Sequence, residues 1–568
     1  MGLNGIFNIG GTALAVNTAA IQTTGNNIAN VGNPEYVRQR ANLGSTVDTK
    51  ISAGQFVGNG VRLDGISRQI DDALEARLRG SLSDGASAST RQDWLGRLEA
   101  TFNELTDSDL STSLSTFFKG WSDLANKPQD SGLRQVVLQN AANVTDWFHQ
   151  IDSSLSSLQE TMNDQVKGMA GTADDLAQQI AKLNVRITAA EGGNAGASAN
   201  GLRDQRDGLI KELSGLMDIT TVETKGGAVN IYVNSEPLVF NADCRGVTTV
   251  QTEVNGHTFL QPAFKANNGV IKISSGQLGA LAKAGDRLRA TADHVDELAG
   301  SLSFELNKLH TAGQGLKGLT STIGQSIVTD TTVPLNDPDS GLKQLPNNGS
   351  FVVHVKNTTT GLTTSTLVKV DLNGTPADTT MDDLIAQINA VDGVTAVNNG
   401  GRLQMSSDDA PTSEITFSQD SSGVLASLGV NTFFSGSKAR DINVSDALVK
   451  DPTLIAAAKN GDSGDNQTAL SIAKLETTAV SSLAGATMKD SYAGMIDNIA
   501  AETSQAATDV ESTAAVTETL TNQRESVSGV SMDEEAVNLM KYQRAYQGAA
   551  RLITVVDELM DTMLNMVR

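Results

Sequence analysis

The stretch MDEEAVNLMKYQRAYQGAARLITVVDELMDTML, residues 532–564, carries the strongest periodic signal in the chain. One apolar series recurs every seven residues at Met532, Leu539, Tyr546, Ile553, Met560 and Val567, and a second series fills Tyr542, Ala549, Val556 and Met563. Two such series on one helix are typical of a coiled-coil seam. The C-terminal end is therefore predicted to be a long amphipathic helix that needs a partner.

The first thirty residues offer a weaker version of the same pattern. One series contains Gly10, Asn17, Thr24 and Val31, and the other contains Leu14, Ile21 and Ile28. The first charged side chain is Glu35, within GNNIANVGNPEYVRQR at residues 25–40. The Asn and Gly residues after Ile28 favour the end of the helix, and Pro34 favours a turn. Both ends of the chain are predicted to be helical and to pack against each other.

Composition excludes several classes of protein. The chain has 568 residues, of which 39% are apolar, enough for about two to four domains. A net charge of −23 argues against nucleic-acid binding, which requires clustered Lys and Arg. The single cysteine, Cys244, excludes an intramolecular disulfide framework and a cysteine-based zinc site. No apolar run reaches membrane-spanning length.

The interior alternates between helical and strand patterns. Apolar residues recur at helical spacing from about 68 to 217, again over 278–310, and again over 466–524. Period-two alternation and β-branched residues mark 220–274, and short strands around one helix mark 320–451.

This order predicts a multidomain α+β fold, in which the N- and C-terminal segments build a helical rod body with inserted β-rich lobes. A string of independent domains is the alternative. The expected division is a terminal coiled-coil tube domain (1–45 and 525–568), a helical bundle domain (46–217, 275–318 and 465–524), and β-rich outer domains (218–274 and 319–464).

Catalytic and metal-binding signatures are missing from the sequence. The histidines His149, His257, His294, His310 and His354 are scattered, without an H-E-x-x-H arrangement. No phosphate-binding loop, dinucleotide-binding fingerprint or G-x-S-x-G motif occurs. NGDSGDNQ, at 460–467, lacks the spaced carboxylates of a calcium loop, and LRDQRDG, at 202–208, is interpreted as a salt-bridged helix start. We expect no enzyme activity, no cofactor and no metal.

Three motifs resemble a known family. NNIANVGNPEYVRQR (26–40) resembles the N-terminal signature of bacterial flagellar rod and hook axial proteins, and the segment 526–564 resembles their closing helix. LRDQRDGLIKELS (202–214) is similar to an internal motif of the members that join hook and filament. The resemblance covers about 1–310 and 465–568. Asn33 and Glu35 depart from it, since the family usually has Thr and Gly there.

The resemblance implies an extracellular structural subunit that forms the junction between hook and filament by polymerising through its terminal helices. It implies export by the flagellar type III apparatus without a cleaved signal peptide. The implied partners are further copies in a ring, the hook protein, a second junction protein (hook-associated protein 3) and a cytoplasmic export chaperone on the C-terminal helix, with neither nucleic acid nor membrane insertion. The residues expected to make polymer contacts are Leu14, Ile21, Ile28, Asn30, Tyr36, Leu539, Tyr542, Tyr546, Ile553, Val556, Met560 and Met563.

A second hypothesis stays open at this point. The Thr- and Asn-rich β segments would also suit a secreted surface-binding or adhesion protein, with a helical stalk and a β-rich binding lobe. Loss of filaments with retention of hooks after deletion of the gene would distinguish the junction subunit from the adhesion protein.

Overall fold

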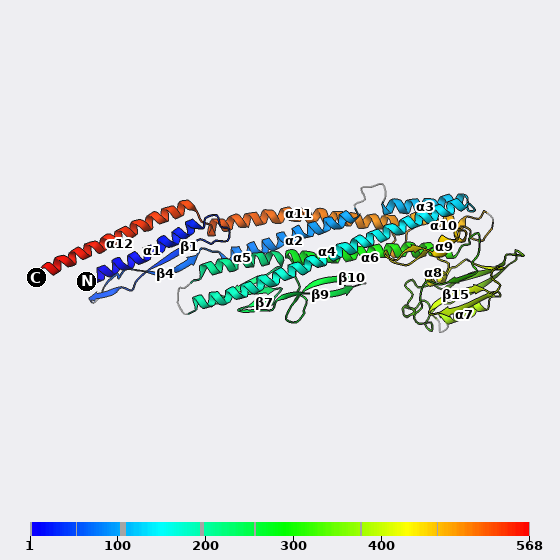
Figure 1. Ribbon diagram of the computed structural model, residues 1–568, viewed down its shortest axis with the longest axis horizontal. Coiled ribbons are helices and arrows are strands. Elements are labelled where there is room, and N and C mark those ends of the chain that lie inside the picture. Colours follow the sequence, from blue (N-terminus) through cyan, green and yellow to red (C-terminus); the bar gives the residue numbers. More distant parts are fainter. Residues whose placement is uncertain are drawn as a thin grey trace. The chain divides into compact units, whose positions relative to one another are not determined.

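The computed structural model describes residues 3–52, 54–102, 109–192, 198–254, 257–374, 378–462 and 464–566. Long helices and several small antiparallel sheets make up these residues, which confirms the expected multidomain α+β class (Figure 1). The chain forms two compact units. Unit 1 comprises Met1–Leu95, Glu160–Asp286 and Thr503–Arg568, and unit 2 comprises Gly96–Gln159 and Arg287–Glu502.

Helices begin and end the described chain. The terminal helices are α1 (Leu3–Ala29) and α12 (Met532–Met566), both in unit 1. The other long helices are α2 (Asp72–Phe102), α3 (Leu110–Asn126), α4 (Ser131–Glu191), α5 (Asn200–Leu216), α6 (Gly276–Thr311) and α11 (Met488–Ser528). Shorter helices are α7 (Met381–Asn389), α8 (Val424–Leu428), α9 (Asp446–Lys450) and α10 (Gln467–Lys474).

Unit 1 contains strands that the sequence patterns did not reveal. Strand β1 (Gln39–Ser45) pairs antiparallel with β4 (Val61–Arg68), and β2 (Thr49–Ser52) pairs with β3 (Gln55–Val57). These residues fall in ranges that we had assigned to helical domains. Apolar and polar residues alternate only weakly in β1 and β4. These two strands are stabilised by pairing with each other and by contact with α1 more than by a buried apolar face, so a strong alternation is not required.

The expected β segment of 218–274 forms two small sheets in unit 1. Strands β5 (Thr220–Glu223), β6 (Val229–Val233), β7 (Glu236–Phe240) and β8 (Asp243–Cys244) lie in that order in the first sheet. Strands β9 (Val247–Val254) and β10 (His257–Phe264) form the second. Val229, Ile231 and Val233 are buried, as the period-two pattern predicts.

Unit 2 contains two three-stranded sheets around one apolar core. The first has the order β13 (Thr363–Val370), β12 (Gly349–Asn357), β16 (Ser413–Ser418), and the second β11 (Ser321–Ile323), β15 (Arg402–Ser407), β14 (Val394–Asn399). Phe351, Phe417 and Leu384 are fully buried between the sheets and α7, which begins with a capping box formed by Thr380 and Asp383. A separate ribbon pairs β17 (Phe434–Ser435) with β18 (Asn443–Val444).

An aromatic cluster in unit 2 surrounds a buried histidine. The rings of Phe117, Trp121 and Phe433 lie within 6.4 Å of one another, centre to centre, and His310 lies 5.6 Å from Phe433. His310 Nδ1 donates to the Asn431 carbonyl at 3.0 Å, and its Nε2 accepts from the Ala456 amide at 3.0 Å. Burial lowers the pKa of His310 to about 4, so the ring is neutral.

Candidate functional site

Helices α1 and α12 pack against each other along their length in unit 1 (Figure 1). Val16 and Ala20 of α1 are 5% and 0% exposed, and Val556 of α12 is 1% exposed. At Gly10 the two backbones come close together, because a Cβ added there would lie 2.7 Å from Ile553 Cγ1. The missing side chain of Gly10 thus allows the helices to approach.

Replacing Gly10 by alanine is expected to destabilise the α1–α12 pair by about 1–2 kcal/mol, because the new methyl must displace Ile553. Gly11→Ala is the matched control: a Cβ at Gly11 meets nothing within 4 Å. Alanine also favours helix over glycine, so the control should keep or slightly raise stability. Hydrogen exchange of α1 and α12 measures the difference; equal losses in both variants would contradict this close contact.

The residues expected at polymer contacts have different surroundings in the unit. Val556 is buried, whereas Tyr546 and Met563 are 40% and 55% exposed. The others are partly buried: Leu14, Ile21, Ile28, Asn30, Tyr36, Leu539, Tyr542, Ile553 and Met560. Val567, from the first heptad series, lies outside the described residues. Contact with neighbouring subunits stays a prediction for all twelve residues.

The deepest positions of α1 escaped the sequence pattern. Besides Val16 and Ala20, the side chains of Thr23, Thr24 and Asn27 are buried, and only Thr24 belongs to a predicted series. Small and polar side chains give little hydropathy contrast, so no heptad series could identify this face. Their spacing by three or four residues was the available signal.

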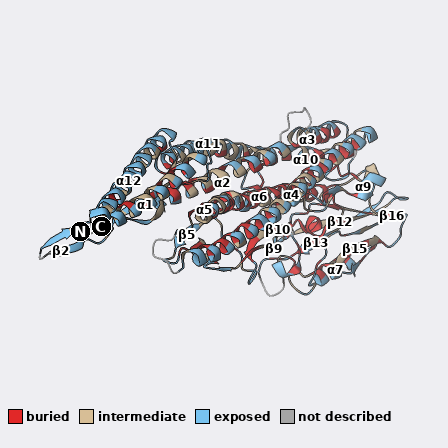
Figure 2. Ribbon diagram, turned by 60° about the vertical axis from the view of Figure 1, so that its left-hand side comes forward, coloured by how far each residue is buried: buried red, intermediate tan, exposed pale blue. Residues whose placement is uncertain are grey.

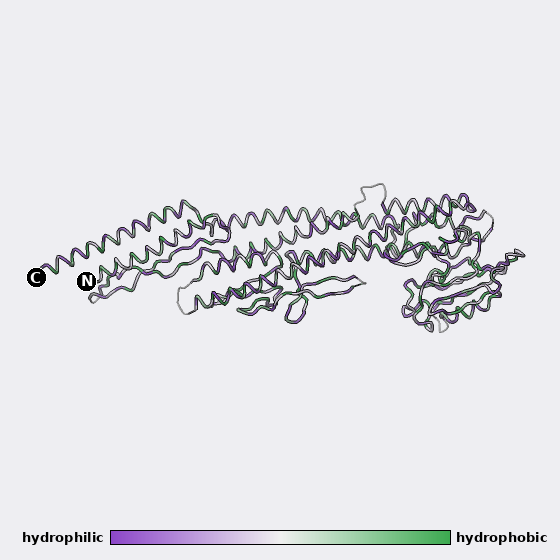
Figure 3. Tube along the Cα trace, in the orientation of Figure 1, coloured by the Kyte–Doolittle hydropathy of each residue, from purple (hydrophilic) through white to green (hydrophobic). Residues whose placement is uncertain are grey.

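A large apolar surface on α12 remains uncovered in unit 1. Its members range from 36% exposed at Leu552 to 82% at Met566, and also include Val537, Met540, Val555, Leu559 and Leu564. Figure 2 shows pale blue, exposed positions along most of α12, and Figure 3 shows hydrophobic positions recurring along the same helix. Because contiguous exposed apolar surface is rare on monomeric proteins, this surface of α12 is a candidate contact surface.

A polar cluster fixes the position of α12 relative to the segment that follows α1. We call Asn27, Tyr36, Arg38 and Glu535 the terminal polar cluster. Asn27 Nδ2 donates to Glu535 Oε2 at 3.0 Å, and Tyr36 Oη donates to Asn27 Oδ1 at 2.8 Å. Arg38 pairs with Glu535 at 2.7 Å and with the more exposed Glu534 at 2.7 Å. Burial raises the pKa of the Tyr36 phenol to about 12, so it remains a donor.

The corner between Asn27 and Tyr36 accommodates Glu35. Gly32 has a φ of +83°, so glycine stands where the backbone is left-handed, and Glu35 lies among the residues with negative φ. Arg524 Nη1 donates to the Pro34 carbonyl at 2.8 Å, and the Arg38 amide donates to the Ser528 carbonyl at 2.9 Å. These bonds attach the corner to the C-terminal end of α11.

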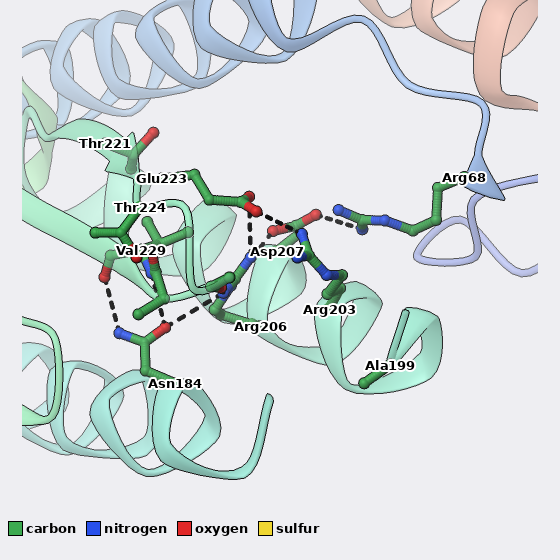
Figure 4. A network of polar contacts seen from close by, with 12 residues as sticks. Arg68, Asn184, Ala199, Arg203, Arg206, Asp207, Thr221, Glu223, Thr224 and Val229 are labelled. Carbon is green, nitrogen blue, oxygen red and sulfur yellow. Dashed lines mark hydrogen bonds and ion pairs between the residues drawn. The ribbon is translucent and has the colours of Figure 1, made fainter. Parts of the chain in front are cut away.

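The LRDQRDG motif forms a buried network of ion pairs on α5, confirming its interpretation as a salt-bridged helix start (Figure 4). Arg68 of β4 pairs with Asp204 at 2.9 Å and Asp207 at 2.6 Å. Arg203 pairs with Glu191 and Glu223, and Arg206 Nη1 donates to the Gly227 carbonyl at 2.6 Å. Burial raises the pKa of Asp204, against the attraction of Arg68. The motif joins α5 to α4, β4 and β5.

We expected neither a metal site nor a membrane-spanning helix in the described part of the chain. Within it, no group of three or more His, Cys, Asp or Glu side chains is placed to hold a metal ion. Nor does any described helix combine the length and apolar character needed to cross a membrane. The 460–467 segment, apart from residue 463, makes turns and the start of α10.

Family models match three parts of the chain. Residues 95–327 match the flagellar hook-associated protein FlgK helical domain, 521–566 the flagellar basal body rod FlgEFG protein C-terminal model, and 353–409 the flagellin hook IN motif. Full-length relatives are similar as well. Flagellar hook-associated protein 1 of Salmonella typhimurium LT2 is 27% identical, over 99% of this chain and all of the relative. The chain is thus similar to flagellar hook-associated protein 1 over almost its whole length.

Other relatives agree in length. The protein of the same name from Escherichia coli K12 is 25% identical over 99% of this chain and all of that protein, and that of Bacillus subtilis 168 is 26% identical over 97% and 96%. A solved structure of the flagellar hook junction protein FlgK from Burkholderia pseudomallei is 16% identical, with a TM-score of 0.49, covering 80% of this chain and all of that one.

The chain is a structural junction subunit of the flagellum and not an enzyme, and the adhesion hypothesis is not favoured.

Proposed function

We propose that this subunit polymerises through α1 and α12 into a ring between hook and filament. The observation that supports this proposal is the exposed apolar surface of α12. Helix α1 packs against α12 along its length but leaves this surface accessible. Burial of such surface contributes about 25 cal/mol per Å², so neighbouring copies would gain most by covering it.

The partners that the family resemblance implies are further parts of the proposal. The hook protein would meet one rim of the ring and hook-associated protein 3 the other. Before assembly, an export chaperone would cover the apolar residues of α12, and the flagellar type III apparatus would carry the chain outward. We also propose the three-part division into a terminal tube, a helical bundle and outer β-rich domains. The terminal tube is supported by the α1–α12 pair and its polar cluster.

A substitution on the uncovered surface tests polymerisation directly. In a strain lacking the gene, which should bear hooks without filaments, Val555→Asp is expected to restore fewer than about a tenth of the filaments, because a carboxylate buried without a partner costs several kcal/mol. Val555 is 51% exposed, so the free subunit should fold normally. Electron microscopy and circular dichroism of the exported protein provide the measurements.

The matched control is Val222→Asp on β5, where the valine is also 51% exposed but lies outside the terminal helices. It should restore normal filaments. Normal filaments with Val555→Asp, or in the strain without the gene, would overturn the proposal.

A further inference from the structure

Unit 2 contains a cavity of about 680 Å³ that is lined in part by β11 and β18, each of which lies at the edge of its sheet. β11 contributes Ser321, Thr322 and Ile323, and β18 contributes Asn443 and Val444. The family resemblance and the terminal helices assign nothing to this cavity. Its size lies in the range of sites that bind ligands or short peptide segments.

The outer edge of β11 has free backbone groups. The Ser407 amide donates to the Thr320 carbonyl at 2.9 Å, and the Gly324 amide donates to the Leu403 carbonyl at 2.7 Å. Since antiparallel pairing alternates along a strand, Thr322 also faces β15, whereas Ser321 and Ile323 direct their amide and carbonyl groups away from it. Among the described residues these groups have no hydrogen-bond partner.

The β17–β18 ribbon has one closed edge and one open edge. Asn307 of α6 closes β17, because its Oδ1 accepts from the Phe434 amide at 2.9 Å and its Nδ2 donates to the Phe434 carbonyl at 2.8 Å. The Ser445 amide donates to the Phe433 carbonyl at 2.8 Å, so Val444 must face outward. Its backbone groups likewise have no partner among the described residues. The Asn307 side chain thus takes the place of a neighbouring strand at the β17 edge, whereas the β18 edge stays open.

The lining of the cavity suits a polypeptide of low charge. Asp446 is its one ionisable residue, and the remaining polar side chains belong to Ser, Thr, Asn and Gln. Ile323 is 45% exposed and offers an apolar contact. Thr432, 4% exposed, has a hydroxyl with no partner in the described part of the chain. A saccharide could bond to these side chains, but only an extended backbone supplies donors and acceptors at the spacing of strand edges.

We propose that an extended, weakly charged segment of a neighbouring axial subunit binds in this cavity by adding a strand to β11 and β18. Strand addition would satisfy the backbone groups of Ser321, Ile323 and Val444 together. The proposal rests on assembly into the flagellum, as proposed above, but not on the terminal helices. It would give the β-rich part of unit 2 a role in contact between subunits.

Amide hydrogen exchange in the purified subunit and in isolated assembled flagella tests the proposal. The amides of Ser321, Ile323 and Val444 should exchange fast in the free subunit and at least about tenfold more slowly after assembly. Thr322 is the internal control, since its amide faces β15 and should be slow in both states. Filaments that assemble normally while the three amides stay fast would overturn this inference and leave the proposed function intact.

A photo-crosslinking amino acid in place of Ile323 identifies the occupant. A cross-link to a polypeptide segment of another subunit is expected, and Ile323→Pro should abolish slow exchange at Val444 in assembled flagella. Proline removes only an outward amide there, so unfolding of the free variant should be unchanged. Slow exchange accompanied by a saccharide adduct, or by cross-links within the same subunit alone, would contradict strand addition.

Discussion

Glu535→Ala is expected to separate the terminal helices of the subunit and to prevent filament growth. The Glu535 side chain is 2% exposed, and its carboxylate binds both Arg38 and Asn27. Removing this carboxylate leaves the buried Asn27 amide without that acceptor and leaves Arg38 with Glu534 alone, at a cost of about 2–4 kcal/mol. Amide exchange in α1 and α12 should therefore accelerate by about a hundredfold or more. Cells carrying the variant should keep hooks and lose most filaments.

Glu534→Ala is the matched control for this experiment. Glu534 is adjacent in sequence and also pairs with Arg38 at 2.7 Å, but its side chain is 62% exposed. Exposed pairs contribute about 0–1 kcal/mol, so exchange and filament number should change little. If amide exchange and filament number are the same in both variants, the buried Glu535 carboxylate does not hold α1 and α12 together. The terminal polar cluster would then not determine the position of α12.

Acidification is expected to destabilise unit 2 through His310. The pKa of this ring is lowered to about 4 by burial, and the nearby Arg134 acts in the same direction. Because the folded pKa lies below the unfolded value, the unfolded state takes up the proton first. The stabilisation is complete above about pH 6.5 and is lost as the pH falls toward 4, by about 3 kcal/mol. Protonation would also place two donors, His310 Nε2 and the Ala456 amide, against each other.

Urea unfolding of the full chain at pH 7.5 and pH 4 measures this loss for the natural protein and for His310→Gln. Glutamine can still donate and accept but does not titrate in this range, so the variant should lose about 3 kcal/mol less between the two pH values. Carboxylates titrate in both proteins and cancel in the difference. Equal pH dependence would show that His310 is not the group responsible.

Heptad spacing was sufficient to predict α12 but not the side of α1 that it covers. The predicted series included both Gly10 and Ile553, which do meet. Leu14 and Ile21 are only partly buried, however, while Val16 and Ala20 are deeper. A helix without charged residues has no clearly polar face, so the pattern does not decide which side packs; the shape of the partner does.

The β1–β4 strands show a second limit. Each derives its hydrogen bonds from the other and packs on α1, and these interactions join parts of the chain that a local window cannot connect. By contrast, the charge pattern of LRDQRDG was informative, because four charges on one helix start can be buried only if they are paired. The partners of these charges, including Arg68 and Glu223, were not predictable from the motif.

The sequence by itself determined that both ends are helical, that the chain turns at the Asn-Gly-Pro corner, and which family the motifs resemble. These features depend on local periodicity, backbone preference and short patterns of residue type. Only the tertiary structure decided that Arg38 pairs with Glu535, 497 residues away, and that β11 and β18 share a cavity. Such contacts depend on which surfaces folding brings together. The free energy of a buried charge or an open strand edge is set by its folded surroundings and not by the local sequence.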